Sequence, residues 1–133
     1  MVPRVGPLKL KAQVICGDEA AIGPGKAALL EAIDREGSIS AAGRVLGMSY
    51  RRTWLLVESM NRCWNDRLVD TIQGGGHDRG ARLTSCGRQV LAAYRSLEKS
   101  LIAAAANQHL EALRKLMLDR PAEPAPARST TTH

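Results

Sequence analysis

Two adjacent arginines, Arg51 and Arg52, belong to a short run of residues that is suited to binding anions. Neighbouring side chains on a helix point about 100° apart, so one guanidinium can reach a guanine edge while the other binds a phosphate. Ser49 and Tyr50 stand directly before them, and their hydroxyls can hold phosphate oxygens together with the free N–H groups of a helix start. The run therefore indicates the beginning of a helix that binds nucleic acid.

The residues before this run have the spacing of a helix-turn-helix. Small side chains at positions 41–43 let two helices cross closely, and Gly47 supplies the positive φ that a tight turn needs. Ser38 or Ser40 can cap the first, short helix, and Ser49 can cap a second helix that we expect to run to about residue 65. In such a motif the first turn of the second helix enters the major groove. An ordinary helical hairpin is the alternative.

The rest of the chain supplies the elements of a winged helix. Leu8, Leu10, Ala12 and Val14 alternate with polar residues, which predicts a half-buried strand. A helix is expected over 25–36, ended by Gly37. Two short strands, 68–72 and 81–83, are joined by a glycine-rich segment that is typical of a hairpin tip. The predicted fold class is mainly α with a small β-hairpin wing: a winged helix-turn-helix with a long C-terminal dimerisation helix.

The last helix is expected to run from about 84 to 118. Its apolar positions Val90, Tyr94, Leu97 and Leu101 keep a helical rhythm. A helix of that length cannot be buried along its whole length against so small a domain, which favours pairing with a second copy of the chain. The alternative is an antiparallel helix pair broken near Asn107. One domain over 8–118 and a disordered tail over 119–133 follow, because the tail lacks apolar bulk.

The positive charge of the chain is concentrated where these motifs lie. The formal net charge is +6, and residues 44–95 carry nine arginines against four acidic residues. Such a basic segment favours a polyanionic partner, and double-stranded DNA above others. The candidate DNA-binding residues, from the helix-turn-helix and the wing, are Ser40, Arg44, Ser49, Tyr50, Arg51, Arg52, Arg79 and Arg82.

Other classes of function find little support in the residues. Cys16, Cys63 and Cys86 are odd in number and lack a C-x-x-C pair, so we expect no disulfide framework and no metal site. Neither a cofactor motif nor a nucleophile with a nearby base is evident, which predicts a protein that is not an enzyme. Without a long apolar run, we expect a cytoplasmic protein. A sensor that uses the three cysteines as redox groups or metal ligands is a minor alternative.

Several motifs resemble one known family. Gly37-Ser-Ile-Ser-Ala-Ala, Leu46-Gly-Met-Ser-Tyr-Arg-Arg-x-Trp54, the glycine-rich wing and Gly80-Ala-Arg-Leu-Thr-x-x-Gly87 are similar to the N-terminal DNA-binding domain of the ModE family of molybdate-responsive regulators. The resemblance covers roughly residues 8 to 118. It implies a LysR-like winged helix-turn-helix, a homodimer formed through the terminal helices, and a palindromic operator. Positions 49–52 would read DNA, with Arg79 and Arg82 in the wing.

The resemblance also implies a difference from the full-length members. Those members continue into small β-barrel domains that bind molybdate, whereas this sequence ends in a Pro/Ala-rich tail. We therefore expect a stand-alone form that lacks the molybdate-binding domains and has no evident small-molecule effector. The expected function is a dimeric, sequence-specific transcription regulator, in molybdate-related gene control. The alternative is a partner module that heterodimerises with a full-length regulator and modulates it.

Overall fold

The structure is a computed structural model and describes residues 2–72 and 80–125. These residues contain five helices and three two-stranded antiparallel hairpins. The helices are α1 (Pro24–Glu36), α2 (Ile39–Val45), α3 (Tyr50–Asn61), α4 (Ser85–Ala105) and α5 (Gln108–Leu116). The hairpins pair β1 (Arg4–Val5) with β2 (Leu8–Lys9), β3 (Val14–Cys16) with β4 (Glu19–Ile22), and β5 (Val69–Ile72) with β6 (Gly80–Leu83). The predicted fold class, mainly α with a small β-hairpin wing, is confirmed.

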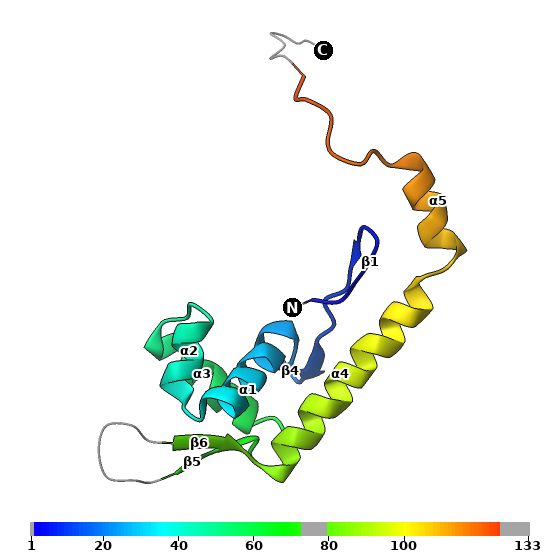
Figure 1. The fold of residues 1–133 in the computed structure, drawn as a ribbon. Helices are drawn as coiled ribbons and strands as arrows, with labels where there is room; N and C mark the ends of the chain where they lie inside the picture. Colours follow the sequence, from blue (N-terminus) through cyan, green and yellow to red (C-terminus); the bar gives the residue numbers. More distant parts are fainter. Residues whose placement is uncertain (1, 73–79, 126–133) are drawn as a thin grey trace.

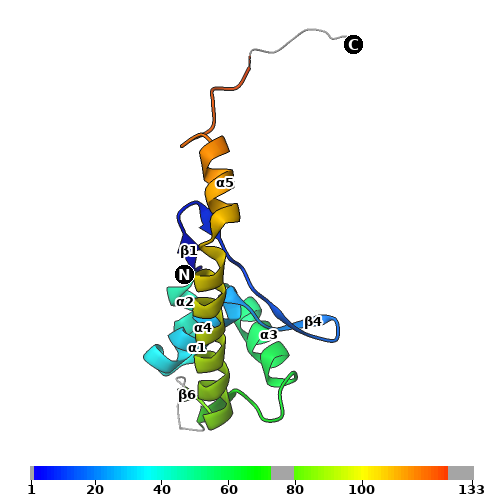
Figure 2. The ribbon, with the colours of Figure 1, turned by 90° about the vertical axis from the view of Figure 1, so that its right-hand side faces the viewer.

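Helices α1 to α3 and the β5–β6 hairpin gather at one end of the molecule, and α4 leads away from them toward α5 (Figures 1 and 2). Aliphatic side chains make up most of the core, and Tyr94 is buried in it as well. Leu29, Leu30 and Ile33 of α1 are fully buried, together with Met60 of α3 and Leu68 before β5. Within the described ranges, no helix is both long and apolar enough to span a membrane.

The expected single strand over 8–14 is wrong. The chain forms two separate hairpins there, with glycines of positive φ in both turns, and residues 10–13 lie in no strand. The alternation of burial is nonetheless present, because Leu8, Leu10 and Ala12 are half-buried between exposed neighbours. At Ala12 the contact is with α4, where the Tyr94 hydroxyl donates to the Ala12 carbonyl at 2.8 Å.

The helix-turn-helix depends on a close crossing of α2 and α3. A Cβ added at Gly43 would lie 2.2 Å from Oγ1 of Thr53, whose side chain is fully buried. The turn between the helices has Gly47 at φ 71°, as predicted. Of the two possible caps for α2, Ser38 is the one used: its Oγ accepts from the Ala41 N–H at 3.1 Å. No residue larger than glycine fits at position 43 unless the helices separate.

Helix α3 ends earlier than expected, at Asn61, and this residue connects it to the wing. The Asn61 Oδ1 accepts from the N–H groups of Leu68 and Val69 at 2.9 and 3.1 Å, while its Nδ2 donates to the Val69 carbonyl at 3.3 Å. On the other strand, the Ala81 N–H donates to the Gly37 carbonyl at 2.9 Å. The β5–β6 hairpin is thus held to the helix-turn-helix at both of its strands.

The continuous helix expected over 84–118 is also wrong. The chain leaves helical geometry at Ala106 and Asn107, and the Asn107 side chain caps α5 by accepting from the His109 N–H at 2.9 Å. The break lies where the alternative placed it, but α5 extends beyond α4 instead of folding back along it (Figures 1 and 2). Residues 117–125 form neither helix nor strand, and the rest of the tail lies outside the described residues, so its disorder stays a prediction.

We predict that Gly43→Ala lowers the free energy of unfolding by about 1–3 kcal/mol, because overpacking against a buried, β-branched Thr53 side chain forces the two helices apart. Urea denaturation followed by circular dichroism measures the loss. Gly25→Ala is the matched control, since a Cβ at Gly25 meets nothing within 4 Å. It should leave stability unchanged or raise it by up to about 1 kcal/mol. Equal effects of the two substitutions would contradict the account.

A second prediction concerns the connection at Asn61. Asn61→Ala should cost about 2–4 kcal/mol of unfolding free energy, because it removes three hydrogen bonds and leaves two N–H groups without an acceptor. Asn61→Asp keeps the acceptor oxygens and should cost clearly less. Hydrogen exchange at Leu68 and Val69 provides a local measurement. Unchanged exchange at both amides in the alanine variant would show that Asn61 does not hold the wing.

Candidate nucleic-acid interface

The first turn of α3 is capped and faces solvent. Ser49 is the N-cap of α3, as predicted, and its Oγ accepts from the Arg52 N–H at 3.1 Å. The hydroxyl proton of Ser49 stays available for another acceptor. Ser49, Tyr50, Arg51 and Arg52 are all exposed, with Tyr50 at 67%. The positive end of the helix dipole adds to the charge of the two guanidinium groups. This turn can therefore bind an anion without rearrangement of the backbone.

The arginines of the basic segment fall into two groups. Some form ion pairs with carboxylates at 4 Å or less: Arg62 with Glu19, Arg67 with Asp70, Arg88 with Asp34, and Arg95 with Glu31 and Glu98. In the described part of the chain, the others have no such partner: Arg44, Arg51, Arg52 and Arg82. The second group consists of the arginines that the sequence predicts to bind DNA. Arg79, which was also predicted, lies outside the described residues.

The arginine with the shortest ion-pair contacts shows how the first group differs from the second. The Arg95 guanidinium contacts Glu31 at 2.6 Å and Glu98 at 2.7 Å, and joins α4 to α1. The hydrogen bond from Arg95 keeps the pKa of the Glu31 carboxyl below its ordinary value. The charge of Arg95 is thus neutralised within the fold, whereas the charges at the start of α3 act on the surroundings.

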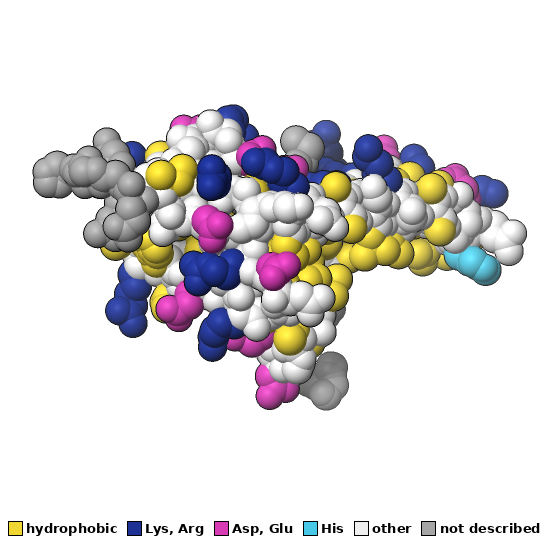
Figure 3. Space-filling view, turned by 90° about the horizontal axis from the view of Figure 1, so that it is seen from below, with side chains coloured by type: hydrophobic (Ala, Val, Ile, Leu, Met, Phe, Trp, Pro, Cys, Tyr) yellow, Lys and Arg dark blue, Asp and Glu magenta, His cyan; other side chains and the backbone are white. Residues whose placement is uncertain are grey.

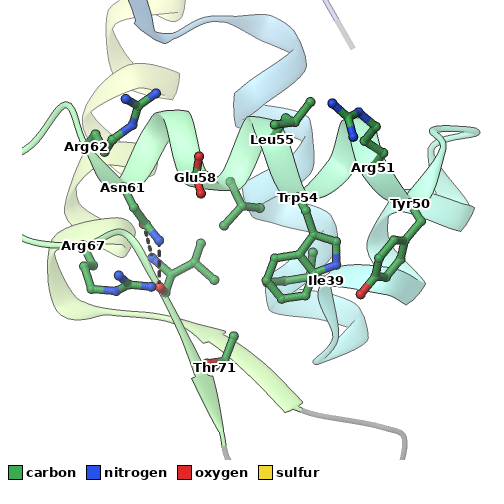
Figure 4. Close-up of a pocket in the computed structure, with 12 residues that line it drawn as sticks. Ile39, Tyr50, Arg51, Trp54, Leu55, Glu58, Asn61, Arg62, Arg67 and Thr71 are labelled. Atoms are coloured by element: carbon green, nitrogen blue, oxygen red, sulfur yellow. Dashed lines mark hydrogen bonds between the residues drawn. The ribbon is translucent and has the colours of Figure 1, made fainter.

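A groove of about 560 Å³ runs beside α3 toward β5 (Figure 4). Arg51, Leu55 and Arg62 are at helical spacing and point to one side of α3, and Glu58 lies between Leu55 and Arg62. Tyr50 and Trp54 point to the other side, where their ring centroids are 6.0 Å apart. The wall opposite α3 includes Arg67 and Thr71.

Only part of the predicted site lines the groove. Tyr50 and Arg51 line it, and four residues that the sequence reasoning missed also do: Leu55, Glu58, Arg62 and Arg67. The first three could have been found by following helical spacing from Arg51 along the exposed face of α3. Arg67 has no such signal, because its position depends on the turn after α3.

The remaining predicted residues lie outside the lining of the groove. Ser40 and Arg44 are four positions apart on α2, Ser40 half-buried and Arg44 exposed. Arg82 is exposed on β6, opposite Asp70 in the strand register. Within the described ranges, no group of three or more His, Cys, Asp or Glu side chains is placed to hold a metal ion. The chemistry that the surface offers is the binding of an extended polyanion.

No protein-family model matches the chain. It is 44% identical over 70 residues to the molybdenum transport protein ModE of Azotobacter vinelandii, a match that covers 53% of this chain and 26% of that protein. It is 43% identical over 79 residues to the molybdenum-pterin-binding protein MopB of Rhodobacter capsulatus, covering 59% and 29%. It is 34% identical over 71 residues to the DNA-binding transcriptional dual regulator ModE of Escherichia coli, covering 53% and 27%.

The matched part thus spans less than a third of the length of each of these relatives. The names of these relatives are those of molybdenum-related or regulatory proteins. A chain whose described residues form a helix-turn-helix with an adjacent hairpin fits such a relationship. Over about half of its length, this chain is therefore similar to proteins named ModE.

Proposed function

We propose that the chain is a sequence-specific, double-stranded-DNA-binding transcription regulator that inserts the first turn of α3 into the major groove. The observation that carries the proposal is the exposed, capped helix start with two arginines that no described carboxylate neutralises. Relatives named as transcriptional regulators support the same reading. Because the names of relatives also refer to molybdenum, we propose molybdenum-related genes as the targets. We propose that the regulator acts in the cytoplasm.

Within this function, Arg51 and Arg52 bind a guanine edge and a phosphate, since their side chains diverge on the helix. The free hydroxyl proton of Ser49 donates to a phosphate oxygen. Glu58, farther along the exposed face, can accept from the amino group of a cytosine.

Elements beside α3 contribute contacts to the DNA backbone. Ser40 and Arg44 lie on α2, which in this motif crosses the backbone. Arg82 on β6 contacts the adjacent phosphates or minor groove, and the same role is proposed for Arg79, which lies outside the described residues. Since β5–β6 is hydrogen-bonded to both Asn61 and Gly37, the wing keeps a defined position relative to α3.

We also propose that the protein binds an inverted repeat as a homodimer. A band of hydrophobic side chains is exposed along the arm that α4 and α5 form (Figure 3). On α4, Leu97 and Leu101 are 41% and 38% exposed. Beside it lies an apolar cavity of about 360 Å³ lined in part by Val90 and Leu97. An apolar helix face of this kind favours pairing with a second copy, and a two-fold axis requires a two-fold symmetric target.

The DNA-reading role is tested with a duplex that the purified chain selects from a random pool. Arg51→Ala and Arg52→Ala should each raise Kd by roughly 5- to 150-fold where the side chain reads a base. The slope of log Kd against log salt should fall by about 1 where it binds a phosphate. Fluorescence anisotropy at several salt concentrations measures both quantities.

The matched control for the variant that combines Arg51→Ala and Arg52→Ala is Lys99→Ala with Lys115→Ala, which removes the same two charges from exposed positions on α4 and α5. This variant should bind nearly as tightly as the unmodified chain. Full, salt-dependent binding by the variant that lacks both Arg51 and Arg52 would refute the assignment of the reading helix.

The dimer is tested by Leu97→Glu with Leu101→Glu, which puts charges into the apolar face of α4. Light scattering should show the mass of a dimer for the unmodified chain and of a monomer for this variant. Ser96→Glu with Ser100→Glu adds the same charges at exposed polar positions and should remain dimeric. A monomeric unmodified chain that pairs only with a longer relative would favour the heterodimerising module instead.

A further inference from the structure

Two cysteines that are far apart in the sequence lie on segments that contact each other in the fold. Cys16 ends β3 and is paired in register with Glu19 of β4. The Glu19 carboxylate accepts from the Ser59 hydroxyl at 3.0 Å and from the Arg62 guanidinium at 3.0 Å. Ser59 lies in the last turn of α3, and Arg62 follows the helix directly before Cys63. The β3–β4 hairpin is thereby fixed against the turn that contains Cys63.

The two thiols differ in how accessible they are. Cys16 is exposed, whereas Cys63 is only partly so. Desolvation raises the pKa of the Cys63 thiol, and the influence of the Cys16 thiol raises it further. Cys86, the third cysteine, lines the apolar cavity beside Val90 and Tyr94 on α4. The fold therefore selects one pair out of three cysteines that have no spacing motif.

We propose that Cys16 and Cys63 form a reversible intramolecular disulfide that tethers the β3–β4 hairpin to the end of the reading helix. The oxidant is a low-molecular-weight disulfide such as glutathione disulfide. The Cys16 thiolate attacks one sulfur of the oxidant, forming a mixed disulfide and releasing one thiol. The Cys63 thiolate then attacks the Cys16 sulfur and displaces the second thiol. Two protein thiols are oxidised while one disulfide is reduced to two thiols.

The two cysteines lie next to turns of the chain. Neither cysteine lies within a helix: Cys16 precedes the turn at Gly17, and Cys63 lies in the turn after α3, where its N–H donates to the Met60 carbonyl at 3.2 Å. The loop that the bond closes contains α1, α2 and α3. Closing so long a loop restricts the unfolded chain, so the oxidised protein is the more stable form. The site is independent of the proposed DNA binding, which uses the opposite end of α3.

Incubation of the reduced protein with glutathione disulfide, followed by alkylation and mass spectrometry without reduction, tests the proposal. A single alkylated cysteine, Cys86, is expected, together with a linked pair of tryptic peptides, 12–26 and 63–67. The oxidised protein should have a Tm higher by about 5 °C or more than the reduced protein. Dithiothreitol should reverse both changes.

Single substitutions provide the controls. Cys86→Ser should form the same linked peptides and show the same rise in Tm. Cys16→Ser and Cys63→Ser should each stop at a glutathione adduct and show no rise. The proposal is overturned if all three thiols are alkylated after oxidation, if the linkage involves Cys86 or a second chain, or if Cys16 and Cys63 both end as glutathione adducts.

Discussion

The contact between Gly43 of α2 and Thr53 of α3 is the constraint on which the rest of the candidate interface depends. The absence of a side chain at Gly43 lets Thr53 be buried at the crossing. The Thr53 hydroxyl donates to the Ser49 carbonyl at 2.8 Å, and the Ser49 side chain caps the same helix. Gly43, Thr53 and Ser49 therefore link the helix crossing to the cap of α3. A change at any of them alters the direction in which Arg51 and Arg52 project.

The electrostatics of the molecule follow from this arrangement. Carboxylates neutralise the arginines that join elements, such as Arg95 between α1 and α4 or Arg62 beside β4. The arginines at the start of α3 form no ion pair with a carboxylate of the described residues. Structural and functional arginines thus differ in their partners, although the sequence shows them as one basic segment. A surface organised in this way attracts a polyanion and orients it along α3.

Local signals in the sequence predicted the helix-turn-helix well. Gly47, the Ser49 cap and the small residues before them determine geometry within a few positions, so α1, α2, the start of α3 and both wing strands agree with expectation. Two other expectations were wrong. The local cap at Asn107 interrupts the last helix, a break that the sequence reasoning gave only as the alternative, and two N-terminal hairpins replace the single strand. The approach of Cys16 to Cys63 requires the fold itself.

The central claim is that the first turn of α3 contacts DNA, and backbone amide chemical shifts measured during titration with a selected duplex test it most directly. The account predicts that the largest changes occur at residues 49–55, with smaller ones at Arg44 and Arg82, and that α5 and the β3–β4 hairpin change little. Large changes confined to α5 or to the β3–β4 hairpin, with residues 49–55 unaffected, would contradict it.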